Sequence, residues 1–470
     1  MALITTQAWS QTKPVTSAKN TSVTVQQSNE TYRFSSSGPT QDFKIEMRGK
    51  IELSDDDKDI KSISDDGYLE ISKTVFGSKR SIVIESLGAG RVKREYYEGR
   101  SLMPWEPNGK KWLGEILPEV VRPSTIGAQS RVNRFFSRGG TTAVLNEIDQ
   151  IESDHVRAHY ANLLMKHPVP PKDYRAVITK LSENMDSDHY MAEFLRSNTG
   201  KFMQHEDATT ALFSAVRNMD SDHYKTEVIK EALKNNRVSP ANVRVALQAA
   251  SQMDSDHYIT EVLTNLLKQN DVKDETISEI ISTAGNMESD HYKMVVLTQA
   301  LDKPGLSETS HNRIVSAVKE MSSDHYVTEV IKHLMENKLS DNSLTQLVDL
   351  LSSVESDHYR TDILKRILAQ QTLTDHQFAK IMAVTSGMDS DHYKTEILKD
   401  AIKRADTNKN IIQALSAAKQ MDSDHYITEV LVSAAPKVKT GSAELKDAYR
   451  ASAKSISSET YYGRALRAIE

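Results

Sequence analysis

The sequence predicts a mostly α fold, an α-solenoid that follows a small antiparallel β-module. A Ser-Asp-His-Tyr motif, or a close variant, recurs nine times within residues 141–470 at intervals of 33 or 34 residues. Such a constant period is typical of stacked helical repeats. Residues 41–108 instead alternate apolar and polar side chains between Gly-containing turns, which is typical of β-hairpins. The two parts therefore differ in architecture.

Composition argues against several classes of protein. The chain contains no Cys, which excludes disulfides, thiolate metal sites and cysteine nucleophiles. A net charge of −6 argues against a general nucleic-acid binder, and no apolar run reaches the roughly 18 residues of a membrane span. Residues 141–470 carry 38 Lys and Arg against 48 Asp and Glu. This acidic excess either attracts basic partner segments or is ordinary solvated helix surface.

The first 40 residues are expected to form a disordered leader or linker, because they are rich in Ser, Thr, Gln and Asn. Ala8 and Ser10 stand where a signal peptidase prefers small residues. Residues 1–10 are therefore interpreted either as a signal-peptide remnant or as an ordinary flexible N-terminus. The preceding apolar stretch is short and has no basic residue before it, which leaves both interpretations open.

Residues 41–108 are predicted to form a β-module of four or five antiparallel strands. Phe43, Ile45 and Met47 alternate with charged residues, and Gly-containing turns separate the later strands. The acidic cluster at residues 55–59 lacks the spacing of a calcium-binding loop. It is interpreted as a solvated turn.

Residues 109–140 have apolar side chains at helical spacing and end at Gly139-Gly140. They are predicted to be a helical bridge that covers the exposed first face of the array, because a solenoid needs an atypical cap at its end. Residues 141–470 then form the repeat array itself.

Each repeat is predicted to contain two helices of about 12 residues. In the fourth repeat, Ser239-Pro240 is a helix start signal, and Val243 and Leu247 begin the apolar stripe of the first helix. The second helix follows the motif. The period equals that of the tetratricopeptide repeat, but the Trp-Leu-Gly pattern of that family is missing. The array is therefore described as broadly HEAT-like.

The motif supplies one Asp-His pair to each of nine repeats. These residues are Asp154, His155, Asp188, His189, Asp222, His223, Asp256, His257, Asp290, His291, Asp324, His325, Asp357, His358, Asp391, His392, Asp424 and His425. A tenth, degenerate copy has Thr460 in place of His. The pairs are predicted to be structural and to lie at the N-terminus of the second helix, where a carboxylate favours the helix dipole.

The first Asp of each motif is expected to cap this helix. In the fourth repeat that residue is Asp254, which places Met253 and Tyr258 at the positions of a hydrophobic staple. Where Glu replaces this Asp, the Ser that follows is expected to be the cap. We also hypothesise that the imidazoles and carboxylates of adjacent repeats form a hydrogen-bonded ladder, because they recur at equal spacing.

Metal binding and catalysis are the alternative interpretations of the motif. An acid follows the His by four residues in most repeats, as Glu261 follows His257, and such pairs share a helix face. A zinc ion needs further ligands within about 2 Å, whereas equivalent His residues of neighbouring repeats are expected about 10 Å apart. A Ser-His-Asp triad fails because residues one or two apart on a helix do not face each other. No catalytic residue, cofactor or metal is predicted.

Three segments support a resemblance to a known group of proteins. They are Phe43 to Ile51, Ile63 to Ile71 and the Ser-Asp-His-Tyr array. Together they resemble uncharacterised exported bacterial proteins that join a small β-module to helical repeats. Similar regions occur as extracytoplasmic extensions of antibiotic-sensor-type membrane metallopeptidases. The resemblance implies a periplasmic or secreted setting, with a cytoplasmic one as the alternative, but no activity, since the peptidase's zinc motif and membrane helices are missing.

The predicted function is a non-enzymatic scaffold that binds a protein or peptide along the solenoid, with no nucleic acid and no membrane span. Solenoids present extended surfaces that suit this role. Positions in the first helices vary between repeats, which favours a binding surface there; they are Arg244, Ser278, Arg313, Gln346 and Lys380. The alternatives are a structural spacer without a specific ligand, and a metal or small-ligand binder that uses the His-acid pairs.

Overall fold

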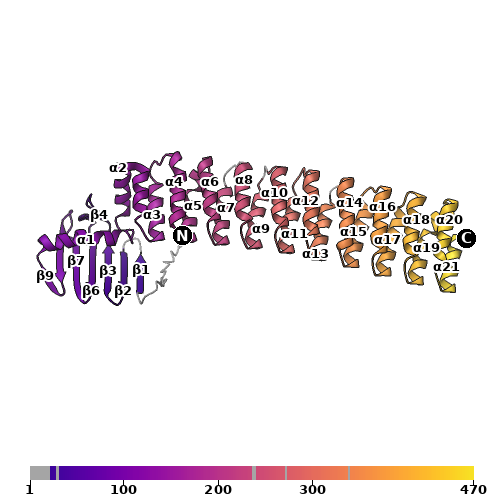
Figure 1. Ribbon diagram of the computed structural model, residues 1–470, viewed down its shortest axis with the longest axis horizontal. Helices are drawn as coiled ribbons and strands as arrows, with labels where there is room; N and C mark the ends of the chain where they lie inside the picture. The colour runs from indigo at the N-terminus through magenta and orange to yellow at the C-terminus, as the bar shows by residue number, and fades with distance from the viewer. Residues whose placement is uncertain (1–21, 28–30, 235–239, 270–271, 337–338) are drawn as a thin grey trace, which may run out of the picture. The chain divides into compact units, whose positions relative to one another are not determined.

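The chain forms two compact bodies, Met1–Tyr224 and Lys225–Glu470, in a computed structural model. The structure describes residues 22–27, 31–234, 240–269, 272–336 and 339–470. The expected signal-peptide remnant lies outside these ranges. The first body holds the β-module and the first helices, and the second holds the remaining helical repeats (Figure 1).

An antiparallel sheet makes up the N-terminal part of the first body. In the described residues its strand order is β1-β2-β3-β6-β7-β8-β9, and β4 and β5 pair as a separate two-stranded ribbon. The strands are β1 (Ser22–Gln27), β2 (Thr31–Ser37), β3 (Gln41–Arg48), β4 (Ile51–Leu53), β5 (Ile60–Ile63), β6 (Tyr68–Val75), β7 (Ser78–Ser86), β8 (Val92–Glu98) and β9 (Ser101–Met103). The ribbon is therefore an insertion between two neighbouring strands of the sheet.

The sheet is larger than the four or five strands predicted, because it begins inside the expected disordered leader. β1 and β2 pair in register with each other, and β2 pairs with β3. Tyr32 is buried, and the Phe34 ring packs edge-on against Phe43 at a centroid distance of 5.9 Å. The prediction of disorder is therefore wrong for residues 22–27 and 31–37. Polar composition concealed the alternation of Tyr32 and Phe34, whose burial stabilises the strand.

One face of the sheet forms the core of the β-module. Four buried residues stand opposite one another in register across β3, β6, β7 and β8, namely Ile45, Ile71, Ile82 and Tyr96. Helix α1 (Lys110–Val121) shares this core, and its Trp112 ring lies 5.9 Å from that of Tyr96. The first part of the expected bridge therefore packs on the sheet, where its apolar stripe matches the apolar strand face.

Helix α2 (Ala128–Ile148) connects the β-module to the first repeat. Its Arg131 is only 2% exposed and contacts Asp57 of the β4–β5 turn at 3.1 Å and Glu147 at 2.6 Å. Burial would lower the pKa of Arg131, but the nearby Tyr160 and the two carboxylates raise it overall. The guanidinium therefore stays charged and holds the ribbon against the helix.

The acidic turn is therefore more than the solvated turn predicted. Arg134 reaches Asp57 at 2.5 Å, and Arg138 reaches Asp55 at 3.4 Å. Arg131, Arg134 and Arg138 are three and four residues apart, so they share one face of α2. An acidic cluster in one segment and a basic helix face in another were a readable sign of this contact, although neither alone identifies its partner.

The array alternates two sets of helices. Those that begin a repeat, the A helices, are α4 (Tyr174–Asn184), α6 (Glu206–Arg217), α8 (Pro240–Ala250), α10 (Asp274–Gly285), α12 (Glu308–Lys319), α14 (Asp341–Leu350), α16 (Asp375–Ser386), α18 (Asn408–Ala418) and α20 (Ala443–Ala453). Those that follow the motif, the B helices, are α3 (Asp154–Leu164), α5 (Asp188–Phe202), α7 (Asp222–Lys234), α9 (Asp256–Leu267), α11 (Asp290–Leu301), α13 (Asp324–Leu334), α15 (Asp357–Gln370), α17 (Asp391–Arg404), α19 (Asp424–Lys439) and α21 (Glu459–Ile469). Helix α2 kinks at Gly139 and Gly140, and its second half takes the A position of the first repeat.

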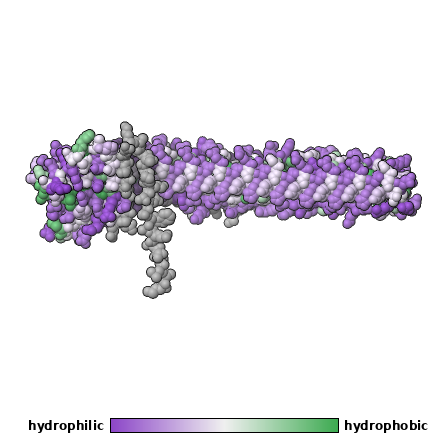
Figure 2. All heavy atoms as spheres, turned by 90° about the horizontal axis from the view of Figure 1, so that it is seen from below, coloured by the Kyte–Doolittle hydropathy of each residue, from purple (hydrophilic) through white to green (hydrophobic). Residues whose placement is uncertain are grey.

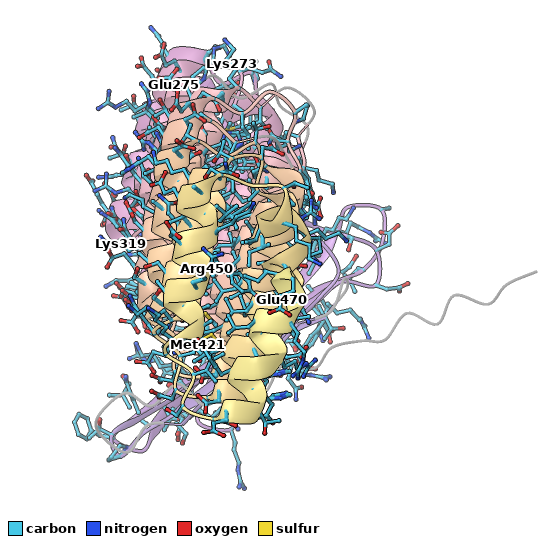
Figure 3. All side chains as sticks on the ribbon, turned by 90° about the vertical axis from the view of Figure 1, so that its right-hand side faces the viewer. Lys273, Glu275, Lys319, Met421, Arg450 and Glu470 are labelled. Atoms are coloured by element: carbon cyan, nitrogen blue, oxygen red, sulfur yellow. The ribbon has the colours of Figure 1, made fainter. Side chains whose placement is uncertain are left out.

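The repeats bury the predicted apolar stripes. In the fourth repeat, Val243 and Leu247 of α8 and Val262, Leu263 and Leu266 of α9 are all buried. The last repeat, viewed from the C-terminal end, shows its two helices side by side (Figure 3). The prediction of an α-solenoid behind a small antiparallel β-module is confirmed.

Candidate functional site

The motif lies at the start of each B helix. In the fourth repeat α9 begins at Asp256, so His257 and Tyr258 are its second and third residues, and Ser255 is the N-cap. The expected cap, Asp254, therefore lies outside the helix at N′, and Ile259 is at N4, so Met253 and Tyr258 do not occupy the positions of a hydrophobic staple. Figure 3 shows that Met421, in the turn before α19, lies at the opposite end of the helices from Glu275 of α10.

Motif Asp residues bind the turn of the next repeat. In the fifth repeat, Oδ2 of Asp290 accepts hydrogen bonds from the backbone N–H groups of Ser322 and Ser323, both at 2.8 Å. The same two-bond contact, which we call the aspartate rung, is made by Asp154, Asp188, Asp256, Asp357, Asp391 and Asp424. An Asp at the first helical position therefore both favours the helix dipole and joins neighbouring repeats.

The motif imidazole lies between two tyrosine rings. The His257 ring is 5.1 Å from Tyr258 of its own repeat and 5.9 Å from Tyr292 of the next repeat. The His257 side chain is 54% exposed, so this row of rings lies at the surface. The hypothesised ladder of imidazoles and carboxylates is therefore corrected in its partners. The motif carboxylates accept hydrogen bonds from backbone N–H groups of the next repeat, and the imidazoles lie beside tyrosine rings.

The acid four residues after the His forms ion pairs. Glu261 contacts His257 at 3.2 Å and Lys230 of the preceding repeat at 2.9 Å. Equivalent lysine–acid pairs join Lys332 to Asp362, Lys365 to Glu396 and Lys399 to Glu429. A lysine beside the carboxylate disfavours a metal cation there. Within the described ranges, no three His, Asp or Glu side chains gather closely enough to hold a metal ion.

The A helices begin differently from the B helices. The Thr374 hydroxyl of α16 accepts the backbone N–H of Gln377, and the Gln377 side chain bonds back to complete a capping box. Side-chain caps of the same kind are made by Ser307, Ser340, Thr407 and Ser442. Contacts between A helices also vary from repeat to repeat. Arg244 bonds to Glu279 at 2.7 Å, for example, whereas Lys380 pairs with Asp349.

The seventh repeat departs from the pattern. Helix α14 ends at Leu350 and continues as a short 3₁₀ turn, Leu351–Ser353. Val354 stands where seven other repeats have Met, and the rung from Asp324 is a single hydrogen bond from the N–H of Ser356. The spacing from His325 to His358 is 33 residues, as is that from His392 to His425, but α14 and α15 begin 16 residues apart, as α12 and α13 do. The A–B turn of this repeat therefore keeps its length, and its apolar residue is smaller.

Two hollows flank this turn. One, of about 340 Å³, is lined by Asp349, Ser352, Arg360, Lys380, Ala383, Val384 and Gly387. The other, of about 260 Å³, lies beside Met321, Val354 and Glu355. The substitution of Val for Met was readable in the sequence. The two hollows depend on which helices lie alongside the turn.

The array surface at the end of the helices where the A–B turns lie is mainly hydrophilic. Evenly repeated bands of intermediate hydropathy cross it (Figure 2). No helix in the described ranges has both the length and the apolar character needed to cross a bilayer. The surface that carries the turns is therefore regular and polar.

Comparison with known proteins gives no family for this chain. No protein-family model and no curated protein matches it. Among solved structures, one match is described as "Computational Design of Self-Assembling Cyclic Protein Homooligomers", with 12% identity over 70% of this chain and 96% of that chain. Its TM-score is 0.12, which is too low to carry an argument. The resemblance to exported bacterial proteins stays a prediction.

Proposed function

We propose that the array is a non-enzymatic scaffold that binds a protein or peptide segment. Helical repeats present long surfaces to partners, which supports the proposal at the level of the fold. The motif is occupied in joining repeats, since its Asp holds the next turn and the neighbouring acids pair with lysines. Specific recognition is therefore expected away from the motif, where the repeats differ.

The observation that carries this proposal is the irregular seventh repeat. A spacer needs only interchangeable interfaces, so hollows at one turn have no use in it. A binding site, in contrast, has to differ from its surroundings. The hollow beside α14 and α16 combines the small residues Ala383 and Gly387 with the charged residues Arg360, Lys380 and Asp349.

The charges at this hollow indicate the kind of contact. Arg360 lies 3.4 Å from Asp357, and Lys380 pairs with Asp349, so both cations already have acidic partners. We expect a partner side chain that packs on the small residues and hydrogen-bonds to the charged rim. A strongly acidic segment would have to displace existing pairs.

The proposal is tested by filling the hollow. Ala383 is exposed on α16, so Ala383→Trp places a large ring over the hollow without disturbing the core. Proteins captured by crosslinking the full chain in extracts of its host are expected to fall roughly tenfold, a loss typical of blocking a central contact. Ser416→Trp is the matched control, because Ser416 is exposed at the equivalent position of α18.

Equal capture by wild type and both variants would contradict binding at the seventh repeat. Absence of any specific partner would favour the structural spacer. A partner lost from both variants alike would point to a general effect of added tryptophan on the array. In each case thermal unfolding followed by circular dichroism checks that the variants remain folded.

A further inference from the structure

The exposed apolar side chains of this protein are concentrated in the β-module. Among the described residues, the large apolar side chains that are exposed are Val75, Phe76, Leu87 and Leu102. Phe76 is 81% exposed and Leu102 is 61% exposed. Hydrophobic side chains are visible on the surface of this region (Figure 2). Phe is costly to leave in water, so its position in a turn calls for an explanation.

The β6–β7 turn presents Phe76 outward. Phe76 has a φ of 47°, in the left-handed region that a residue with a side chain seldom adopts. A Cβ built on the neighbouring Gly77 meets no atom within 4 Å, so the turn projects into open space. Neither core packing nor backbone preference therefore explains an aromatic residue at this tip.

The β8–β9 turn lies at the same end of the sheet. Val75 pairs with Ser78, and Arg80 pairs with Glu98, so the β6–β7 turn extends about 7 Å beyond the level at which the next turn begins. Leu102 follows this second turn on edge strand β9. Leu87 lies in the β7–β8 turn, at the opposite end of β7, and is not part of the patch. Leu102 stands opposite Tyr97, which stands opposite Ser81, so it lies behind the β6–β7 turn and on the face of the sheet opposite Val75. Val75 and Phe76 thus form the protruding apolar end, which we call the sheet tip.

Basic side chains surround the sheet tip. Lys79 and Arg80 follow the β6–β7 turn, Arg100 lies in the β8–β9 turn, and all three are exposed. Two carboxylates at this end, Asp42 and Glu98, each accept a hydroxyl hydrogen bond, from Ser37 and from Tyr96, and keep their charge, so three basic side chains stand against two acidic ones. Lys73 pairs with Glu119 at 2.6 Å. The tip therefore has an excess of positive charge beside its apolar residues.

We infer that the sheet tip docks on the surface of an anionic lipid bilayer. Phe76 and Val75 enter the boundary between headgroups and acyl chains, and Lys79, Arg80 and Arg100 contact lipid phosphates. A convex tip favours a bilayer, since a deformable interface accepts a protrusion that offers no groove to a peptide. The inference does not depend on the scaffold proposal, because it involves the β-module alone.

The test uses the full chain and sedimentation with vesicles of phosphatidylcholine, made with or without phosphatidylglycerol. Wild type is expected to bind the vesicles that contain phosphatidylglycerol, and less strongly at high salt. Phe76→Ser is expected to weaken binding roughly tenfold, the effect of losing one large buried apolar side chain. Leu87→Ser is the matched control and is expected to bind as wild type does.

Three results would overturn the inference. The first is no binding to the anionic vesicles by the folded wild-type chain. The second is an equal loss of binding in Leu87→Ser. The third is a concentration-dependent dimer, seen by light scattering, that Phe76→Ser abolishes, since the tip would then be covered by a second copy. All substituted positions are exposed, so unchanged tryptophan fluorescence from Trp112 is expected to confirm folding.

Discussion

At the scale of single residues, the motif Asp has a role that sequence position alone conceals. It is the first residue of a B helix, yet its hydrogen bonds go to the following repeat. Asp290 accepts hydrogen bonds from two backbone N–H groups, whereas Asp324 accepts one, from Ser356. A residue repeated nine times thus acts between repeats rather than within them.

Replacing Asp290 with Ala is expected to destabilise the contact between α11 and the turn before α13. Two N–H groups lose a charged acceptor, which costs about 3 kcal/mol in the free energy of local opening. Asp324→Ala is expected to cost about half as much, because one N–H group is affected. Amide hydrogen exchange at Ser322, Ser323 and Ser356 measures both. Equal losses in the two variants would show that the number of hydrogen bonds does not set the effect.

At the scale of helices and strands, the two helix types of each repeat start by different means. A helices use a Ser or Thr side chain as a cap, as Thr374 does in α16. The B helix of the same repeat has Ser390 at its N-cap, but this side chain makes no cap hydrogen bond. Its preceding turn is held by Asp357 of the repeat before. The start of a B helix is therefore stabilised by its neighbour.

Thr374→Ala is expected to lower the free energy of unfolding by about 1 kcal/mol, the usual cost of removing a cap hydrogen bond. Ser390→Ala is the matched control and is expected to change stability by no more than a few tenths of a kcal/mol. Urea denaturation followed by circular dichroism compares the two. A larger loss in Ser390→Ala would mean that the B-helix serine caps its helix in solution.

At the scale of the whole molecule, the link between the β-module and the first repeat depends on a buried charge. Arg131 joins Asp57 of the β4–β5 turn to Glu147 near the end of α2. Removing one partner of such a network leaves carboxylates buried without compensation. The same helix carries Arg138, whose side chain is 56% exposed beside Asp55, and exposed pairs contribute little.

Arg131→Met is expected to destabilise the first body by about 3–5 kcal/mol. Arg138→Met should change its stability by less than about 1 kcal/mol. Trp112 lies in the core of the β-module, so its fluorescence during urea denaturation reports on this body. A near-neutral Arg131→Met would show that the β-module and the first repeat are held together by their apolar contacts alone.

The sequence by itself determined the repeat array. The period of 33 or 34 residues, the apolar stripes of the helices and the position of the motif at the A–B turn are local patterns, and each is set by neighbours a few residues apart. The sequence also has Val354 where seven other repeats have Met, but the hollows beside it are not visible in the sequence.

Only the tertiary structure decided the contacts between distant segments. The hydrogen bonds from Asp290 span 32 and 33 residues, and the contact between Arg131 and Asp57 spans 74. The same holds for β1 and β2, whose polar composition suggested disorder, and for α1, which packs on the sheet. Such contacts depend on which surfaces meet after folding, and a local pattern shows what a segment can form but not what it will pack against.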